Sequence, residues 1–152
     1  MATNRSTTTR RTLHYYWQVT RKHFGLFAAL MASTFLFVAL LSYGNPYVMS
    51  LVVDRVSAGS VEADQVFTVY GPYIVALIAI NVLGQAASKL QDYTMYKLEI
   101  AAAYDLATMS FDALCNQSIS FHSNRFGGTL VSQTSKFMSA YQLLLETITF
   151  PF

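Results

Sequence analysis

The stretch that decides the fold runs from Val61 to Gln117 and reads VEADQVFTVYGPYIVALIAINVLGQAASKLQDYTMYKLEIAAAYDLATMSFDALCNQ. Its only helix-breaking residues are Gly71, Pro72 and Gly84, and no glycine or proline occurs from Gln85 to Phe126. We therefore expect one unbroken helix over about residues 61–117, which would be roughly 85 Å long at 1.5 Å per residue.

The two halves of this stretch differ in polarity. Val66–Ser88 contains no charged residue, and its length suffices to cross a hydrocarbon core about 30 Å thick. Lys89–Gln117 contains several acids and bases but keeps strong helix formers such as Leu98 and Ala101. We expect the first half to span a membrane and the second half to project from it as a stalk. The apolar residues of the stalk are spread around the helical wheel, which predicts contacts on several sides.

Composition also indicates a membrane protein. The chain has 152 residues, of which 53% are hydrophobic and 12% charged, with a mean hydropathy of +0.35. Half of its lysines and arginines precede Phe24, and no acid precedes Asp54. A basic segment directly before an apolar run favours a juxtamembrane role over nucleic-acid binding, and we expect no nucleic-acid partner. With Cys115 as its single cysteine, the chain has no internal disulfide.

The segment before the first apolar run falls into two parts. Residues 1–12 are rich in threonine and arginine without apolar periodicity, and we expect a disordered basic tail. Leu13–His23 mixes aromatic and basic residues. Two interpretations stay open for it: a short helix lying at the level of the lipid headgroups, or a simple aromatic flank of the first span.

The first membrane span is expected over about residues 24–55. Phe24–Val53 contains no charge, and it is too long for the apolar core of a signal peptide. Gly44-Asn45-Pro46 predicts a kink near its outer end. Gly59 is expected to end this helix, and Ser60 to cap the second.

Charge placement predicts the orientation in the membrane. Asp54–Gln65 holds one arginine and three acids, whereas five bases precede the first span. By the positive-inside rule, the N-terminus is cytoplasmic, the short loop lies outside, and the stalk returns to the cytoplasm. We expect a multi-pass protein of the plasma membrane.

After the stalk, residues 118–127 combine small polar residues, two phenylalanines and a glycine, and they predict a tight reversal. An apolar seam then repeats at alternating steps of four and three, at Leu130, Thr134, Phe137, Tyr141, Leu144 and Ile148. This pattern predicts an amphipathic helix over about residues 128–152 that packs antiparallel against the stalk. It has just become fully apolar at Phe152, so the chain is expected to stop in mid-helix.

Motifs for catalysis or cofactor binding are missing from this sequence. It contains no G-x-x-x-x-G-K-[ST] phosphate loop, no H-E-x-x-H motif and no cysteine cluster. The three histidines, at positions 14, 23 and 122, are scattered. We expect no catalytic, cofactor or metal site in the chain itself.

The order of these parts resembles the start of the membrane domain of a type I ABC exporter. Pro46–Asp54 is similar to the segment with which the first span of that family ends. Phe121 and Gly128–Ser132 are similar to the family's first coupling helix and to the start of its third helix. The chain departs from the family pattern at Gln133, where arginine is common, and at Phe137, where aspartate is common.

The resemblance implies an all-α membrane fold, with residues 13–152 as the front of a truncated six-helix domain. It implies export driven by ATP and Mg²⁺, which are bound by a nucleotide-binding domain outside this chain, and pairing with a second transporter half in a homo- or heterodimer. By resemblance, Phe121 would anchor the coupling turn in that ATPase domain. His122, Ser123, Asn124 and Arg125 would make polar contacts there.

Two other classes of function fit parts of this pattern. A two-span sensor or receptor with a cytoplasmic signalling helix would need a sensing domain between its spans, and only about a dozen residues lie there. A small membrane scaffold would have to explain why the third helix stops at Phe152. The transporter is the interpretation that accounts for the long stalk, because a rigid helix transmits displacement that a loop would absorb.

Overall fold

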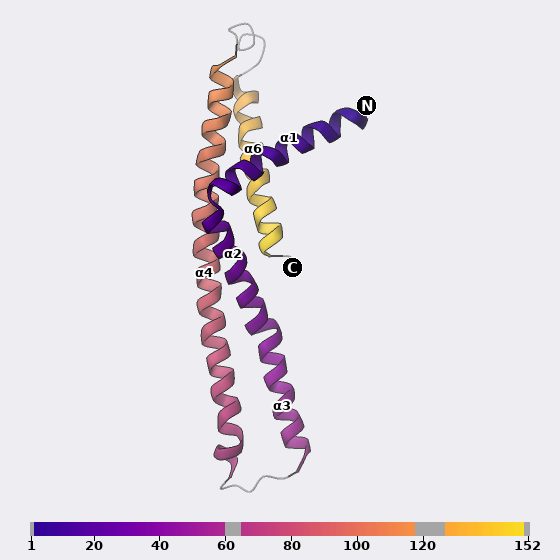
Figure 1. The fold of residues 1–152 in the computed structure, drawn as a ribbon, viewed down its shortest axis with the longest axis vertical. Coiled ribbons are helices and arrows are strands. Elements are labelled where there is room, and N and C mark those ends of the chain that lie inside the picture. The colour runs from indigo at the N-terminus through magenta and orange to yellow at the C-terminus, as the bar shows by residue number, and fades with distance from the viewer. Residues whose placement is uncertain (1, 60–64, 118–126, 151–152) are drawn as a thin grey trace. The chain divides into compact units, whose positions relative to one another are not determined.

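The computed structural model describes residues 2–59, 65–117 and 127–150, and these ranges contain helices and no strand. The helices are α1 (Ala2–Lys22), α2 (Phe24–Phe37), the π-helix η1 (Val38–Gly44), α3 (Asn45–Ser57), α4 (Val66–Cys115) and α6 (Gly127–Thr149), as Figure 1 shows. The chain forms two compact units. The junction unit comprises Met1–Ala28 and Thr94–Phe152, and the hairpin unit comprises Ala29–Tyr93.

Helix α4 has the continuity that the sequence predicts. It runs from Val66 to Cys115 without a break and includes Pro72. It begins five residues after the expected start at Val61, and residues 60–64 lie outside the described ranges. Pro72 lies in the second turn of α4. The backbone hydrogen bond that it cannot donate is therefore lost close to the start of the helix, and the rest of the helix keeps its bonds.

Helix α1 is longer than expected. It begins at Ala2, so it includes most of the segment for which the sequence predicts a disordered tail, and it is longer than the short helix that was one of the two open interpretations of Leu13–His23. No glycine or proline interrupts Ala2–Lys22. Once the second half is fixed by packing, each further residue adds a hydrogen bond without a new nucleation cost.

In the junction unit, one face of α1 is buried. Tyr16, Val19 and Thr20 expose 7% of their surface or less. Val19 and Thr20 follow Tyr16 by three and four residues, which places all three on one face of the helix. Hydrogen bonds from this face reach α6, and an ion pair from the end of α1 reaches α4. Helix α1 is therefore held by both neighbours.

The stalk part of α4 buries a single stripe in this chain. Its buried members in the junction unit are Thr94, Met95, Leu98, Ala102, Asp105 and Leu106. Contacts on several sides were expected, but Tyr104 and Phe111 remain exposed. The physical reason is that α1 and α6 cover one side of the stalk within the described chain. Full burial of Leu98 or Leu106 contributes about 1.5–3 kcal/mol each.

Helix α6 lies antiparallel beside the end of α4, which Figure 1 shows in yellow and orange. Leu130 and Tyr141 of the predicted seam are buried. The prediction is wrong for the last two seam positions, Leu144 and Ile148. Leu145 is buried in place of Leu144, and Ile148 is 48% exposed. A straight helix has 3.6 residues per turn, so a seam repeating every 3.5 residues drifts around it. The buried stripe therefore passes from Tyr141 to Leu145 by a second step of four.

In the hairpin unit, the first apolar helix changes its winding before Pro46. Residues Val38–Gly44 form η1, and the N–H of Asn45 donates to the carbonyl of Leu40, five residues earlier. Pro46 has no N–H and stands in the first turn of α3. The irregularity lies where the sequence predicts a kink, but it takes the form of a widened helical turn and not of a break.

The first apolar helix packs closely on α4 within the hairpin unit. A Cβ atom built on Gly84 would lie 2.5 Å from Cδ2 of Leu41, so only glycine fits against this leucine as placed. Nearby, Asn81 Nδ2 donates to Asn45 Oδ1 at 3.0 Å, and Asn45 Nδ2 donates back to Asn81 Oδ1 at 3.4 Å. Small residues that allow backbones to approach, together with such polar pairs, are typical of packing in membranes.

Helix α3 ends where the sequence predicts. Ala58 caps the helix by donating its N–H to the carbonyl of Asp54. Gly59 follows with φ +143°, a conformation that side-chain-bearing residues rarely adopt. The prediction that Gly59 ends this helix is confirmed. The predicted cap Ser60 lies outside the described residues.

Candidate functional site: the junction of α1 with α4 and α6

The residues predicted to couple the chain to an ATPase domain lie outside the described ranges. They are Phe121, His122, Ser123, Asn124 and Arg125. The structure describes the helices on either side of them. Helix α4 ends at Cys115, and Gln117 donates its backbone N–H to the carbonyl of Leu114. Helix α6 begins at Gly127.

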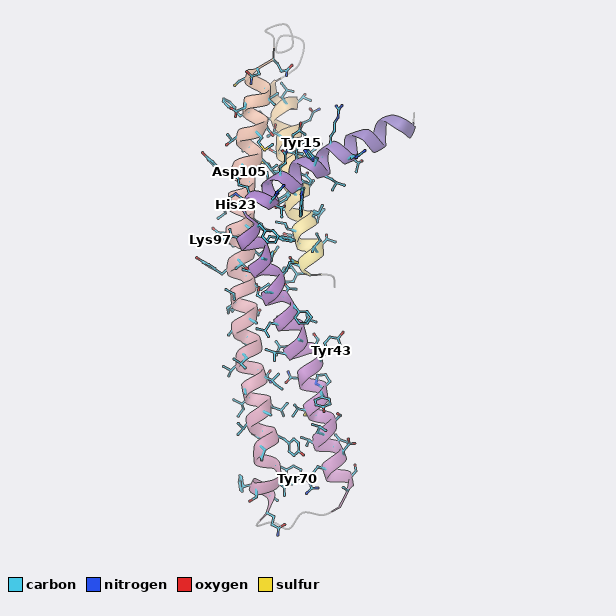
Figure 2. All side chains as sticks on the ribbon, in the orientation of Figure 1. Tyr15, His23, Tyr43, Tyr70, Lys97 and Asp105 are labelled. Atoms are coloured by element: carbon cyan, nitrogen blue, oxygen red, sulfur yellow. The ribbon has the colours of Figure 1, made fainter. Side chains whose placement is uncertain are left out.

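Within the junction unit, an ion cluster joins the end of α1 to α4. Lys22 Nζ lies 2.7 Å from Oδ1 of Asp105, and His23 Nε2 lies 2.8 Å from Oδ2. Figure 2 shows His23 and Asp105 next to each other. The Asp105 side chain is 11% exposed, whereas that of Lys22 is 64% exposed. Each carboxylate oxygen thus has its own donor, and the carboxylate is shielded from water.

The acidity of Asp105 reflects this arrangement. Burial raises the pKa of Asp105, but the hydrogen bonds from Lys22 and His23, together with their positive charges, outweigh it. The net pKa of this carboxyl is below its ordinary value. The ionised form of Asp105 is therefore the one that ties α1 to α4. No pattern in the sequence indicates this pairing, because the partners are more than 80 positions apart.

A second contact ties α1 to α6. The hydroxyl of Tyr16 donates to the backbone carbonyl of Phe137 at 2.7 Å. The hydroxyls of Thr20 and Tyr141 lie 2.9 Å apart, and Thr20 also donates to the carbonyl of Tyr16. The rings of Tyr16 and Tyr141 meet edge to face with centroids 5.2 Å apart. Burial raises the pKa of both tyrosines, so they stay neutral donors at physiological pH.

One acidic side chain where α6 packs on α4 has a buried oxygen without a hydrogen bond among the described residues. Oε1 of Glu99 is buried without a hydrogen bond. Burial, and then the negative charge of Glu146 on α6, raise the pKa of Glu99 above its ordinary value. The ionised form of this carboxyl is thus disfavoured where α6 packs on α4.

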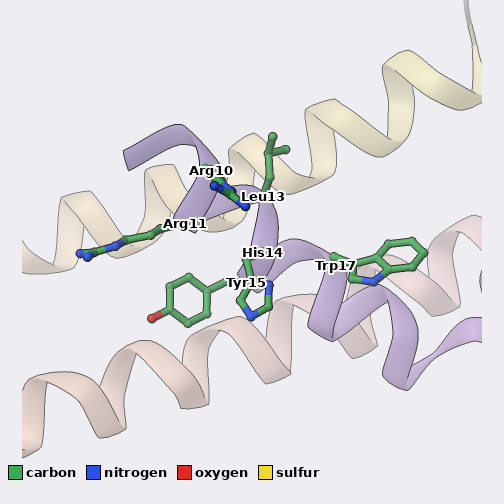
Figure 3. Close-up of a pocket in the computed structure, with 6 residues that line it drawn as sticks. All are labelled: Arg10, Arg11, Leu13, His14, Tyr15 and Trp17. Carbon is green, nitrogen blue, oxygen red and sulfur yellow. The ribbon is translucent and has the colours of Figure 1, made fainter. Parts of the chain in front are cut away.

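The cavities of the junction unit are open grooves. One, of about 680 Å³, lies along α1 and is lined by Arg10, Arg11, Leu13, His14, Tyr15 and Trp17, which Figure 3 shows projecting from the helix. Another, of about 460 Å³ and mostly apolar, lies between α4 and α6 and includes Tyr104, Phe111, Val131 and Met138. Both are lined by side chains suited to lipid or protein surfaces.

Among the described residues, no three histidine, cysteine or acidic side chains come together as a metal site. We call the contacts at this junction the clamp: an ion pair holds α1 against α4, and hydrogen bonds of hydroxyl groups hold α1 against α6.

Two helical stretches are long and apolar enough to cross a membrane, Phe24–Ser57 and Val66–Cys115. Hardly any residue in their most apolar windows is buried. The core helix of a water-soluble protein would instead be covered. Both stretches thus have the length, composition and exposure of membrane-spanning helices.

Comparison with known proteins identifies the family. The model of the ABC transporter transmembrane region matches residues 15–152. Neither curated proteins nor solved structures gave a match. The matched residues include the last eight residues of α1 and the helices from α2 to α6, and the match confirms the resemblance inferred from the sequence. The chain belongs to the family of ABC transporter transmembrane regions.

Proposed function

We propose that this chain is the front of the membrane domain of an ATP-driven exporter that works as a dimer. The observation that carries the proposal is the unbroken α4, which joins an uncharged apolar half to a charged half. A helix of 50 residues is about 75 Å long, more than twice the thickness of the hydrocarbon core. Such a helix passes displacement from one end to the other.

In this proposal, the N-terminus is cytoplasmic and the charged half of α4 projects into the cytoplasm. ATP and Mg²⁺ act in a nucleotide-binding domain outside this chain. That domain receives the turn with Phe121 as its aromatic anchor, and His122 to Arg125 make polar contacts around it. An aromatic anchor at the centre of an interface commonly supplies much of its binding energy.

The clamp on α1 supports the same role. If α4 and α6 transmit movement, the segment that enters the membrane from the N-terminal side has to move with them. The contacts of Asp105 with Lys22 and of Tyr141 with Thr20 supply that attachment. They lie between helices far apart in sequence, so they join parts that would otherwise be linked only through the chain.

The test uses the full-length protein reconstituted in lipid vesicles. The proposal predicts ATP hydrolysis that orthovanadate inhibits. A photo-reactive benzoylphenylalanine in place of Phe121 should form crosslinks to the ATPase domain, identified by mass spectrometry. The same residue in place of Phe67, which is 86% exposed near the other end of α4, is the matched control and should not crosslink to that domain.

Two outcomes would overturn parts of this proposal. A full-length protein without vanadate-sensitive hydrolysis would contradict ATP-driven export. Crosslinks from position 121 confined to α4 and α6 would show that Phe121 only plugs the end of the helix pair, and the coupling role would be wrong.

A further inference from the structure

Two asparagines meet in the hairpin unit within stretches that carry no charge. Asn45 and Asn81 exchange side-chain hydrogen bonds of 3.0 and 3.4 Å, and Asn81 Nδ2 also donates to the carbonyl of Leu77 at 2.8 Å. Asn81 is exposed and Asn45 is half-buried. Their surroundings, Phe24–Val53 and Val66–Ser88, contain no acid or base.

The pair leaves hydrogen-bonding capacity unused. A primary amide has two N–H donors and two acceptor positions on its oxygen. Both donors of Asn81 are engaged, whereas the amide nitrogen of Asn45 makes one long contact. At least one N–H of Asn45 and further acceptor positions on both oxygens remain available to another molecule.

Next to Asn45 the backbone is also irregular. The π-helix η1 ends at Gly44, and Pro46 lacks an N–H to donate back into it. One carbonyl oxygen of this turn therefore loses its usual intrahelical donor. Short π-helical segments of this kind are frequent at functional sites.

Further polar residues lie on the same face of helix α4 as Asn81. Asn81, Gln85, Ser88 and Asp92 follow one another at steps of four, three and four, which places them on one face of the helix. Asn81, Gln85 and Asp92 are exposed, and Ser88 is half-buried. Several exposed residues between them are apolar, including Val82, Leu83 and Leu90, which are 51–62% exposed, whereas Lys89 is the exposed base of this stretch.

The separation of polar from apolar residues on the exposed surface of α4 has a direct consequence in a membrane. Lipid tails cannot form hydrogen bonds, so polar side chains in a span face protein or a water-filled cavity. The face with Asn81 and Gln85 is therefore directed away from lipid. Leu83, two positions and roughly 200° around the helix from Asn81, belongs to the lipid side.

We infer that Asn45, Asn81 and Gln85 form a hydrogen-bonding site on the transport path for a neutral polar group, such as an amide, of an otherwise apolar cargo. The inference rests on the proposed transport function. The cargo group is neutral because the site offers no charge to balance one. The nearest charges on the helix, Lys89 and Asp92, lie about 6 Å and about 10 Å along it from Gln85 and are paired with each other at 3.4 Å.

The first arm of the test measures water access. In the full-length protein with Cys115 and any other cysteines replaced by serine, Asn81→Cys and Leu83→Cys are exposed to a charged, membrane-impermeant thiol reagent. Position 81 should react at least tenfold faster than position 83. An unreactive position 81 would mean that the asparagines are only a clamp between helices, and equal rates would mean that no face is selected; either result overturns the inference.

The second arm measures the ligand class by protection from the reagent of Ser88→Cys, which lies on the same face beyond Gln85 and leaves the three site residues intact. Dodecanamide, dodecanoate and dodecyltrimethylammonium share a chain and differ in their head group. Dodecanamide should slow labelling most, and added Asn45→Leu should remove that protection. Equal protection by the three probes, or protection unaffected by Asn45→Leu, would contradict a site for a neutral group.

Vanadate-sensitive ATP hydrolysis, measured on the same samples, keeps the two proposals apart. Normal hydrolysis with failed labelling would refute this site alone. Absent hydrolysis in the unsubstituted protein would refute the transport function itself.

Discussion

The ammonium group of Lys22 lies 2.7 Å from Oδ1 of Asp105, although the two residues are 83 positions apart. Lys22 ends α1 and Asp105 belongs to the buried stripe of α4, so this ion pair joins two helices that are far apart in the sequence. His23 occupies the second carboxylate oxygen at 2.8 Å.

Removing the charge of Asp105 should loosen the attachment of α1. Asp105→Asn in the full-length protein is expected to lower the free energy of unfolding by about 1–3 kcal/mol, because two donors lose a charged, largely buried acceptor. Asp112→Asn, at an exposed position of the same helix, is the control and should change stability little. Thermal unfolding in detergent measures both, and equal melting temperatures would contradict a structural role for the cluster.

The same cluster predicts a dependence on pH. The pKa of Asp105 is lower in the folded protein than in the unfolded chain, so its stabilisation is present above the unfolded pKa. It is lost as the pH falls from the unfolded pKa through the folded one. Melting curves of the wild type between pH 3 and 7 should therefore decline more steeply on acidification than those of Asp105→Asn. Parallel curves would show that Asp105 is not linked to folding.

For Glu99, the predicted pH dependence of stability has the opposite sign. Its pKa is raised on folding by burial and by Glu146, so folding favours the protonated carboxyl and stability falls as the pH rises towards the folded pKa. Glu99→Gln, which removes the charge, should raise the free energy of unfolding at pH 7 by about 1 kcal/mol. At acidic pH the variant and the wild type should converge. A gain that is equal at every pH would exclude the electrostatic explanation.

Close packing at Gly84 gives a prediction for the hairpin unit. Gly84→Leu forces a side chain into the space of Leu41 and should destabilise the protein by about 1–3 kcal/mol. Gly71→Leu on the same helix is the matched control, because a Cβ atom there meets nothing within 4 Å. Adding Leu41→Ala should recover part of the loss at position 84. No recovery in this double-mutant cycle would mean that the two residues are not coupled.

The polar contact of α1 with α6 can be tested by itself. Tyr141→Phe removes the hydroxyl that lies 2.9 Å from Thr20 while keeping the ring against Tyr16. The expected loss is about 0.5–1.5 kcal/mol, the usual net value of one hydrogen bond. Tyr104→Phe, at a 73% exposed position on α4, serves as the control. A change at position 141 no larger than that at position 104 would show that the bond adds nothing.

Much of the helical framework was predictable because its causes are local. The absence of glycine and proline after Gln85 predicted that α4 continues beyond the membrane span, and Gly59 predicted the end of α3. Pro46 predicted an irregular first span, since proline removes a backbone donor wherever it stands. Each of these effects acts within a few residues.

The register of α6 was predictable in part. The seam from Leu130 to Tyr141 holds, but the burial of Leu145 in place of Leu144 depends on how far the helix drifts relative to α4. Likewise, helix over Ala2–Thr12 did not follow from composition, because it extends a helix that is held farther along the chain by Tyr16 and Thr20. The coupling role of Phe121 stays a prediction.

The sequence by itself determined that this is a helical membrane protein of the ABC transporter family, because runs of apolar residues and the positions of breakers carry that information locally. Only the tertiary structure decided that Asp105, among the acids of the stalk, pairs with Lys22 and His23. It also decided that Asn45 meets Asn81. Such partners lie tens of residues apart, and their pairing depends on the crossing and register of packed helices, which no local pattern specifies.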